Sequence, residues 1–163
     1  MGLVGSGSTS SAEREILWEV MSLIEKSLHI ALQAHAGQID KAGKPYILHP
    51  LRIMTKMATE EEMSVALLHD VIEDTEYTLE SLLDAGIPLT VVDAVQCLTK
   101  MYGEDYEQFI QRVLTNELAV KVKMADIEDN LNVLRLKTLG DGDLERVKKY
   151  HAAWNMLDKY DPR

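Results

Sequence analysis

The sequence is poor in features that would place the protein outside the cell or in a membrane. It has one cysteine, Cys97, among 163 residues, so no disulfide can form within the chain. No run approaches the roughly 18 uninterrupted apolar residues of a membrane-spanning helix. The start of the chain lacks a basic segment followed by an apolar one. We therefore expect a cytoplasmic protein, neither exported nor membrane-bound, with its cysteine packed in the core.

Positive charge is also scarce. Lys and Arg total 17 against 27 Asp and Glu, which gives a formal net charge of −10. This sign repels the phosphate backbone of nucleic acids and anionic lipid surfaces. We therefore expect a small-molecule partner rather than duplex nucleic acid or a membrane, and the sequence indicates no particular oligomeric state.

The chain does contain enough apolar sequence for one core. Hydrophobic residues make up 46% of it and charged residues 27%, as in a single globular domain. A domain of this length needs no metal or disulfide merely to fold, so a bound metal would serve chemistry. Residues 1–11, rich in Gly and Ser, are interpreted as a flexible tail of the kind that expression vectors also supply. Residues 12–163 are assigned to the domain.

Apolar residues recur at helical spacing along most of the domain. They predict one long opening helix from Ala12 to His35, a loop with two glycines and two prolines over residues 36–50, and further helices to the end of the chain. His35 itself is interpreted as a core or loop-bracing residue. The β-branched run at residues 120–122 has no alternating partner, so a helix is favoured there over a strand. The expected fold is all-α, with about seven or eight helices.

Four titratable side chains crowd one short segment: His69, Asp70, Glu73 and Asp74. An imidazole beside a carboxylate can begin a divalent-metal site, and carboxylates one helical turn further can orient a water and move its proton. A solvated acidic helix end is the alternative, because a His-Asp pair alone often arises by chance.

Two distant residues strengthen the metal interpretation. His49 precedes Pro50, and Asp126 interrupts a mostly apolar helical face. Burial of a lone carboxylate is costly, so Asp126 is expected to have a partner or a metal. Two imidazoles and two carboxylates suit manganese, iron or zinc, and the spacing does not choose among them.

Three stretches in consistent order resemble the HD-superfamily hydrolase domain of RelA/SpoT-type alarmone hydrolases. They are GKPYILHP at residues 43–50, ALLHDVIEDT at residues 66–75, and KMAD at residues 123–126 with Asn130. Several motifs in register are far more specific than one His-Asp pair. The resemblance implies an all-α domain with one divalent ion, typically manganese, that removes the 3′-pyrophosphate from guanosine tetra- or pentaphosphate.

The resemblance also implies roles for individual residues. The expected metal ligands are His49, His69, Asp70 and Asp126. Glu73 and Asp74 match the acidic pair that activates water and transfers protons. Lys41, Tyr46 and Asn130 match substrate-binding positions. Nearby lysines can make the site locally positive in an acidic protein: Lys41, Lys44, Lys100 and Lys123.

Three positions depart from the family pattern. Asp40 stands where an arginine usually stacks on guanine, and Ile127 and Asn132 stand where arginines are usual. Such losses remove planar stacking and bidentate phosphate contacts. An HD phosphohydrolase for another nucleotide and a non-catalytic nucleotide-binding module are therefore kept as alternatives. The acidic pair at residues 73 and 74 favours an enzyme over the binding module.

Overall fold

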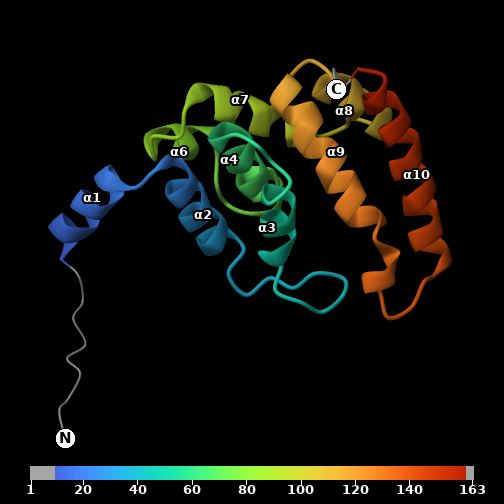
Figure 1. Ribbon diagram of the computed structural model, residues 1–163, viewed down its shortest axis with the longest axis horizontal. Coiled ribbons are helices and arrows are strands. Elements are labelled where there is room, and N and C mark those ends of the chain that lie inside the picture. Colours follow the sequence, from blue (N-terminus) through green and yellow to red (C-terminus); the bar gives the residue numbers. More distant parts are fainter. Residues whose placement is uncertain (1–9, 161–163) are drawn as a thin grey trace, which may run out of the picture.

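The computed structural model describes residues 10–160, whose regular elements are all helical (Figure 1). The only β-type pairing among these residues is an isolated bridge between Ile39 and Pro45. The predicted all-α class is confirmed. The tail prediction falls largely on residues 1–9, outside the described residues.

The elements in chain order are α1 (Ser11–Val20), α2 (Leu23–Ala34), α3 (Leu48–Met54), α4 (Glu60–Leu68), α5 (Val71–Asp74), α6 (Leu79–Asp84), α7 (Leu89–Leu98), α8 (Tyr106–Val113), α9 (Glu117–Leu131), the 3-10 helix η1 (Val133–Arg135) and α10 (Asp141–Asp158).

The described helices outnumber the seven or eight expected, partly because the predicted opening helix is broken into α1 and α2. The break lies at Met21 and Ser22, whose backbone is extended. Ser22 Oγ accepts a hydrogen bond from the Glu25 N–H, and the Glu25 carboxylate accepts one from the Ser22 N–H. This reciprocal capping box starts a new helix, so the continuous helix expected from residue 12 to residue 35 is wrong.

A second break separates α4 from α5 and carries His69 and Asp70 between the two helices. The acidic segment is therefore a junction between two helices rather than one solvated helix end. Residues 120–122 lie inside α9, so the preference for helix over strand there is confirmed.

Helix α4 forms the centre of the core. It packs against α2, α3, α7 and α9, and residues 64–68 are all buried. Leu67 and Leu68 are completely inaccessible to solvent, and full burial of such a side chain stabilises the fold by about 1.5–3 kcal/mol. Helix α10 lies along α9 at the far side of the molecule from α1 (Figure 1). No helix within residues 10–160 is long and apolar enough to cross a membrane.

One buried carboxylate joins α4 to α9. Glu62 accepts hydrogen bonds from the backbone N–H groups of Ala58 and Thr59, and from Lys121 Nζ at 2.7 Å. The hydrogen bond from Lys121, with the backbone bonds, outweighs the effect of burial and holds the pKa of Glu62 below its ordinary 4.5.

Replacing Glu62 with Gln is expected to lower the free energy of unfolding by about 1–2 kcal/mol at neutral pH, because the charge-assisted bond to α9 is lost. A carboxylate with a depressed folded-state pKa stabilises the fold fully above its unfolded-state pKa. That contribution disappears as the pH falls through the folded-state pKa. Urea unfolding at about pH 7 and about pH 3 should therefore give a smaller difference between variant and wild type at the lower pH. The exposed neighbour substitution Glu60→Gln should change stability by less than about 0.5 kcal/mol.

Candidate active site

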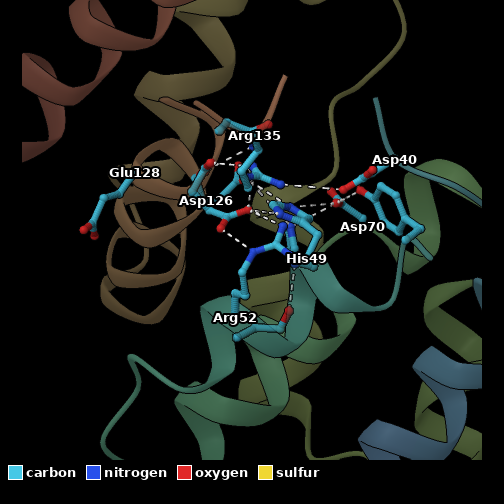
Figure 2. A network of polar contacts seen from close by, with 12 residues as sticks. Asp40, His49, Arg52, Asp70, Asp126, Glu128 and Arg135 are labelled. Atoms are coloured by element: carbon cyan, nitrogen blue, oxygen red, sulfur yellow. Dashed lines mark hydrogen bonds and ion pairs between the residues drawn. The ribbon is translucent and has the colours of Figure 1, made fainter. Parts of the chain in front are cut away.

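The four predicted metal ligands come from three helical segments and lie close together. Figure 2 labels three of them, His49, Asp70 and Asp126. His49 lies in the first turn of α3, His69 and Asp70 at the junction of α4 and α5, and Asp126 in α9. His49 Nε2 lies 3.2 Å from Asp126 Oδ1 and 3.7 Å from Asp70 Oδ2. Ligand atoms of His49, His69 and Asp126 all lie within 4.8 Å of one another. Asp70 Oδ2 lies 3.0 Å from His69 Nε2.

The hydrogen bonding of His69 fits a metal at this point. Its Nδ1 lies 2.8 Å from the carbonyl oxygen of Ala66, and because a carbonyl only accepts, Nδ1 carries the hydrogen. Its Nε2 is buried and has no hydrogen-bond partner of acceptable geometry within the described structure. A divalent ion would use this lone pair and offset the repulsion between Asp70 and Asp126. The donor set therefore fits a divalent metal.

The same groups perturb one another strongly. Burial alone would lower the pKa of His49, but hydrogen bonds to Asp126 and Asp129 outweigh it and raise that pKa to about 9. Burial would raise the pKa of Asp126, but Lys123 and the two histidines hold it well below its usual range. The cluster thus holds protons that a metal must displace, so metal affinity falls with decreasing pH.

Three of the predicted ligands, His49, Asp70 and Asp126, form one wall of a cavity of about 530 Å³. The loop after α2, the end of α5 and helices α8, α9 and α10 form the rest of the wall. Among the described residues lining the cavity are all the predicted site residues except His69 and Asp74. His69 is fully buried behind Asp70.

Of the acidic pair Glu73 and Asp74, the first lines the cavity and the second lies at the surface. Glu73 lines the cavity, and its Oε2 accepts a hydrogen bond from the Lys100 backbone N–H at 3.0 Å. Asp74 is largely exposed, and its backbone oxygen accepts a bond from Gln38 Nε2. Partial burial, together with repulsion from Asp70 and Glu73, raises the pKa of Asp74. A carboxyl group with a raised pKa is suited to carry a proton.

Two residues predicted to bind substrate also contact predicted metal ligands. The Tyr46 hydroxyl donates to Asp70 Oδ2, and Asn130 Nδ2 donates to Asp126 Oδ1 at 2.6 Å. Burial and the charge of Asp70 raise the pKa of Tyr46, which keeps its hydroxyl a donor. Both residues line the cavity, so each can orient a carboxylate ligand and face a bound molecule. Their roles toward substrate stay predictions.

The cavity is more cationic than the sequence analysis anticipated. Of the lysines expected to make it positive, Lys44 is not among the described lining residues. Three further cations line it: Arg135, Arg146 and Lys149. Lys149 Nζ lies 4.5 Å from the centre of the Tyr106 ring and 5.2 Å from that of Tyr150. The cavity therefore joins the wall that carries the candidate metal ligands to cationic groups, which suits a ligand with several negative charges.

Arg146, Lys149 and Tyr150 of α10 line the cavity but were not predicted from the sequence, because apolar periodicity locates a helix without assigning a role to its polar positions. Their spacing of three and four residues was the available signal, since it places Lys149 and Tyr150 one turn beyond Arg146 on the same side of α10.

The family departures have different structural consequences. Asp40 Oδ1 accepts hydrogen bonds from the backbone N–H groups of Ala42 and Lys44, each at 2.9 Å. Its Oδ2 lies 3.6 Å from Arg135 Nη1. Asp40 thus shapes its loop, with a guanidinium from η1 beside it. Ile127 is buried in the core, so only Asp40 and Asn132 of the three positions line the cavity.

An all-α fold in which two histidines and two aspartates cluster beside a cavity forms a candidate divalent-metal centre, the arrangement that the resemblance to HD-type hydrolases implies. No family model matches the sequence. The chain is nevertheless 30% identical over 154 residues to a guanosine-3′,5′-bis(diphosphate) 3′-pyrophosphohydrolase of Vibrio cholerae, a match that covers 85% of this chain and 21% of the relative. It is 34% identical over 151 residues to a GTP pyrophosphokinase of Streptomyces coelicolor, which covers 85% of this chain and 17% of the relative. The chain thus spans about a fifth of the length of the curated relatives it matches.

A solved structure has the same fold. It is described as a metazoan ortholog of SpoT that hydrolyzes ppGpp, and it aligns with a TM-score of 0.68 and 22% sequence identity. The alignment covers 84% of this chain and 85% of that chain. The sequence matches confirm the predicted resemblance to the RelA/SpoT-type pyrophosphohydrolase domain, and the solved structure shows that the fold is shared.

Proposed function

We propose that this chain is a metal-dependent phosphohydrolase that removes the 3′-pyrophosphate from guanosine tetra- or pentaphosphate. The observation that carries the proposal is the convergence of His49, His69, Asp70 and Asp126 at the wall of a cationic cavity. The similarity to a guanosine-3′,5′-bis(diphosphate) 3′-pyrophosphohydrolase over most of the chain supports it. The loop carboxylate of Asp40 favours, as second candidate, an HD phosphohydrolase for a different nucleotide.

The four ligands would hold one divalent ion, for which we propose manganese. Iron and zinc also suit two imidazoles with two carboxylates. When bound, such an ion lowers the pKa of water and offsets negative charge on phosphoryl oxygens. Tyr46 and Asn130 orient the two carboxylate ligands through their hydrogen bonds.

The chain's own residues supply the proton transfers. Glu73, at the cavity wall, accepts a proton from the attacking water. The water oxygen forms a bond to the phosphorus that is attached to the 3′-oxygen. The bond from that phosphorus to the 3′-oxygen breaks, and Asp74 supplies a proton toward the leaving oxygen. The products are pyrophosphate and the guanosine 5′-diphosphate or 5′-triphosphate. Lys41 and the cations of η1 and α10 bind the remaining phosphates.

A nucleotide panel tests this proposal. Protein freed of metal with a chelator and reloaded with Mn²⁺ should release pyrophosphate from guanosine tetraphosphate, and the chelated protein should not. Adenosine 3′,5′-bis(diphosphate) and GTP are the comparison substrates, with products separated by ion-exchange chromatography. Turnover of a comparison substrate alone would favour the second candidate. Binding without turnover of any nucleotide would favour a non-catalytic module.

We also propose that the protein acts in the cytoplasm on a free nucleotide. Its one cysteine, Cys97, is half-buried against the core, as suits a reducing compartment. The net charge of −10 disfavours contact with nucleic acid or anionic lipid.

A further inference from the structure

Asp129 lies directly behind the ligand His49, and nothing in the sequence motifs singles it out. Its side chain is buried in α9, with a relative exposure of 6% for the residue. Its Oδ2 lies 2.7 Å from His49 Nδ1. It also accepts hydrogen bonds from two arginines, Arg52 on α3 and Arg135 on η1, both of which are labelled in Figure 2. One carboxylate on α9 thus connects the His49 ring and Arg52 of α3 with Arg135 of η1.

The contact with Asp129 decides which nitrogen of His49 can bind a metal. A carboxylate accepts hydrogen bonds and donates none, so the nitrogen that faces it carries the hydrogen. Nδ1 is therefore occupied, and Nε2 remains as the ligand atom. Nε2 is also the nitrogen that faces the cluster, 3.2 Å from Asp126 Oδ1.

The arginines fix the carboxylate itself. Arg52 binds it through two hydrogen bonds, from Nε to Oδ1 at 2.7 Å and from Nη2 to Oδ2 at 2.9 Å. A paired guanidinium contact of this kind sets the plane of a carboxylate. Arg135 Nη2 donates to Oδ2 at 3.1 Å and to the Asp129 backbone oxygen at 2.6 Å. Burial would raise the pKa of Asp129, but His49 and Arg52 hold it well below its usual range.

Arg52, which holds the Asp129 carboxylate, lies on the same helix as the predicted ligand His49. Arg52 follows His49 by three residues on α3, so the two side chains lie on one face and reach the same carboxylate. The contact that docks α3 on α9 is therefore also the contact that aims the imidazole. A rotation of either helix would move both.

We infer that Asp129 is a positioning residue, which holds His49 with Nε2 toward the metal and is itself held by Arg52 and Arg135. The inference rests on the metal site of the proposed function and not on the identity of the nucleotide. Side chains that orient a metal-bound histidine typically change metal affinity by about 10–100-fold when replaced. Asp129 should therefore act on metal affinity more than on substrate affinity.

The test compares Asp129→Asn with Glu128→Gln in the full chain. Glu128 is the adjacent acidic residue on α9, is 61% exposed in its side chain, pairs with Lys56, and lies apart from the cluster (Figure 2). Calorimetric titration with Mn²⁺ alone should show a dissociation constant raised about 10–100-fold in Asp129→Asn and unchanged in Glu128→Gln. At saturating Mn²⁺ the KM for guanosine tetraphosphate should stay within about twofold of wild type.

A spectroscopic readout separates positioning from general loosening of the fold. In ¹⁵N spectra of the Zn²⁺-loaded wild type, His49 should show a protonated Nδ1 and a metal-bound Nε2, and Asp129→Asn should weaken or reverse this assignment. Arg52→Lys, which keeps the charge but loses the paired contact, should raise the Mn²⁺ dissociation constant by a smaller factor and serves if the first variant unfolds. Wild-type Mn²⁺ affinity in both variants would overturn the inference. Normal metal behaviour without nucleotide hydrolysis would overturn the proposed function and leave Asp129 as the positioning residue.

Discussion

Replacing Asp126 with Asn is expected to abolish Mn²⁺ binding and to lower hydrolysis of guanosine tetraphosphate by at least about 100-fold. Asp126 Oδ1 faces His49 Nε2, and Oδ2 accepts a hydrogen bond from Lys123 Nζ at 2.7 Å. Asn keeps the shape but removes the negative charge, so a divalent ion loses a ligand and Lys123 loses its counter-charge. Mn²⁺ titration and initial rates of pyrophosphate release would measure the two effects.

The matched control for this substitution is Asp93→Asn, which neutralises an exposed carboxylate on α7 outside the cavity. It should retain wild-type metal affinity and rate. If Asp126→Asn also bound Mn²⁺ as tightly as wild type, Asp126 would be removed from the ligand set and its burial would need another explanation.

Replacing Glu73 with Gln is expected to lower turnover about 100- to 10,000-fold while leaving Mn²⁺ affinity unchanged. Gln retains an oxygen that can accept the hydrogen bond from the Lys100 N–H, so the local backbone should hold. What Gln loses is the ability to take a proton from water. The split between kcat at saturating Mn²⁺ and the dissociation constant of Mn²⁺ is the measurement.

Glu76→Gln is the corresponding control, since Glu76 is the next exposed acidic residue after α5 and does not line the cavity within the described structure. Unchanged turnover in Glu73→Gln would remove Glu73 from the mechanism. A large fall in Mn²⁺ affinity would instead make it a metal ligand.

The candidate ligands could be singled out in the sequence because several of them break their local pattern. Asp126 interrupts an apolar stretch of helix, and in the structure its buried carboxylate accepts hydrogen bonds from Lys123 and Asn130. His69 and Asp70 end the most apolar run of the chain. Helical periodicity likewise predicted the all-α class, because it depends only on neighbours three and four residues apart.

The contacts of Asp129 with His49, Arg52 and Arg135 could not be predicted in the same way. His49 and Asp129 are 80 positions apart, and Arg52 and Asp129 are 77 apart. Periodicity shows that a polar side chain lies off the apolar face of a helix, but not whether that side chain contacts another helix or water. The break before α2 could have been predicted, however, because Ser22 and Glu25 have the sequence spacing of a capping box, the same spacing as Thr59 and Glu62 at the start of α4.

The wide separation of the proposed ligands along the chain would couple metal binding to folding as well as to chemistry. An unfolded chain does not hold α3, the α4–α5 junction and α9 together, so the proposed ligand set is complete only in the native state. Mn²⁺ at 100 times its dissociation constant would then stabilise the fold by about 2.7 kcal/mol. The abundance of folded protein would follow the supply of metal even where no nucleotide is present.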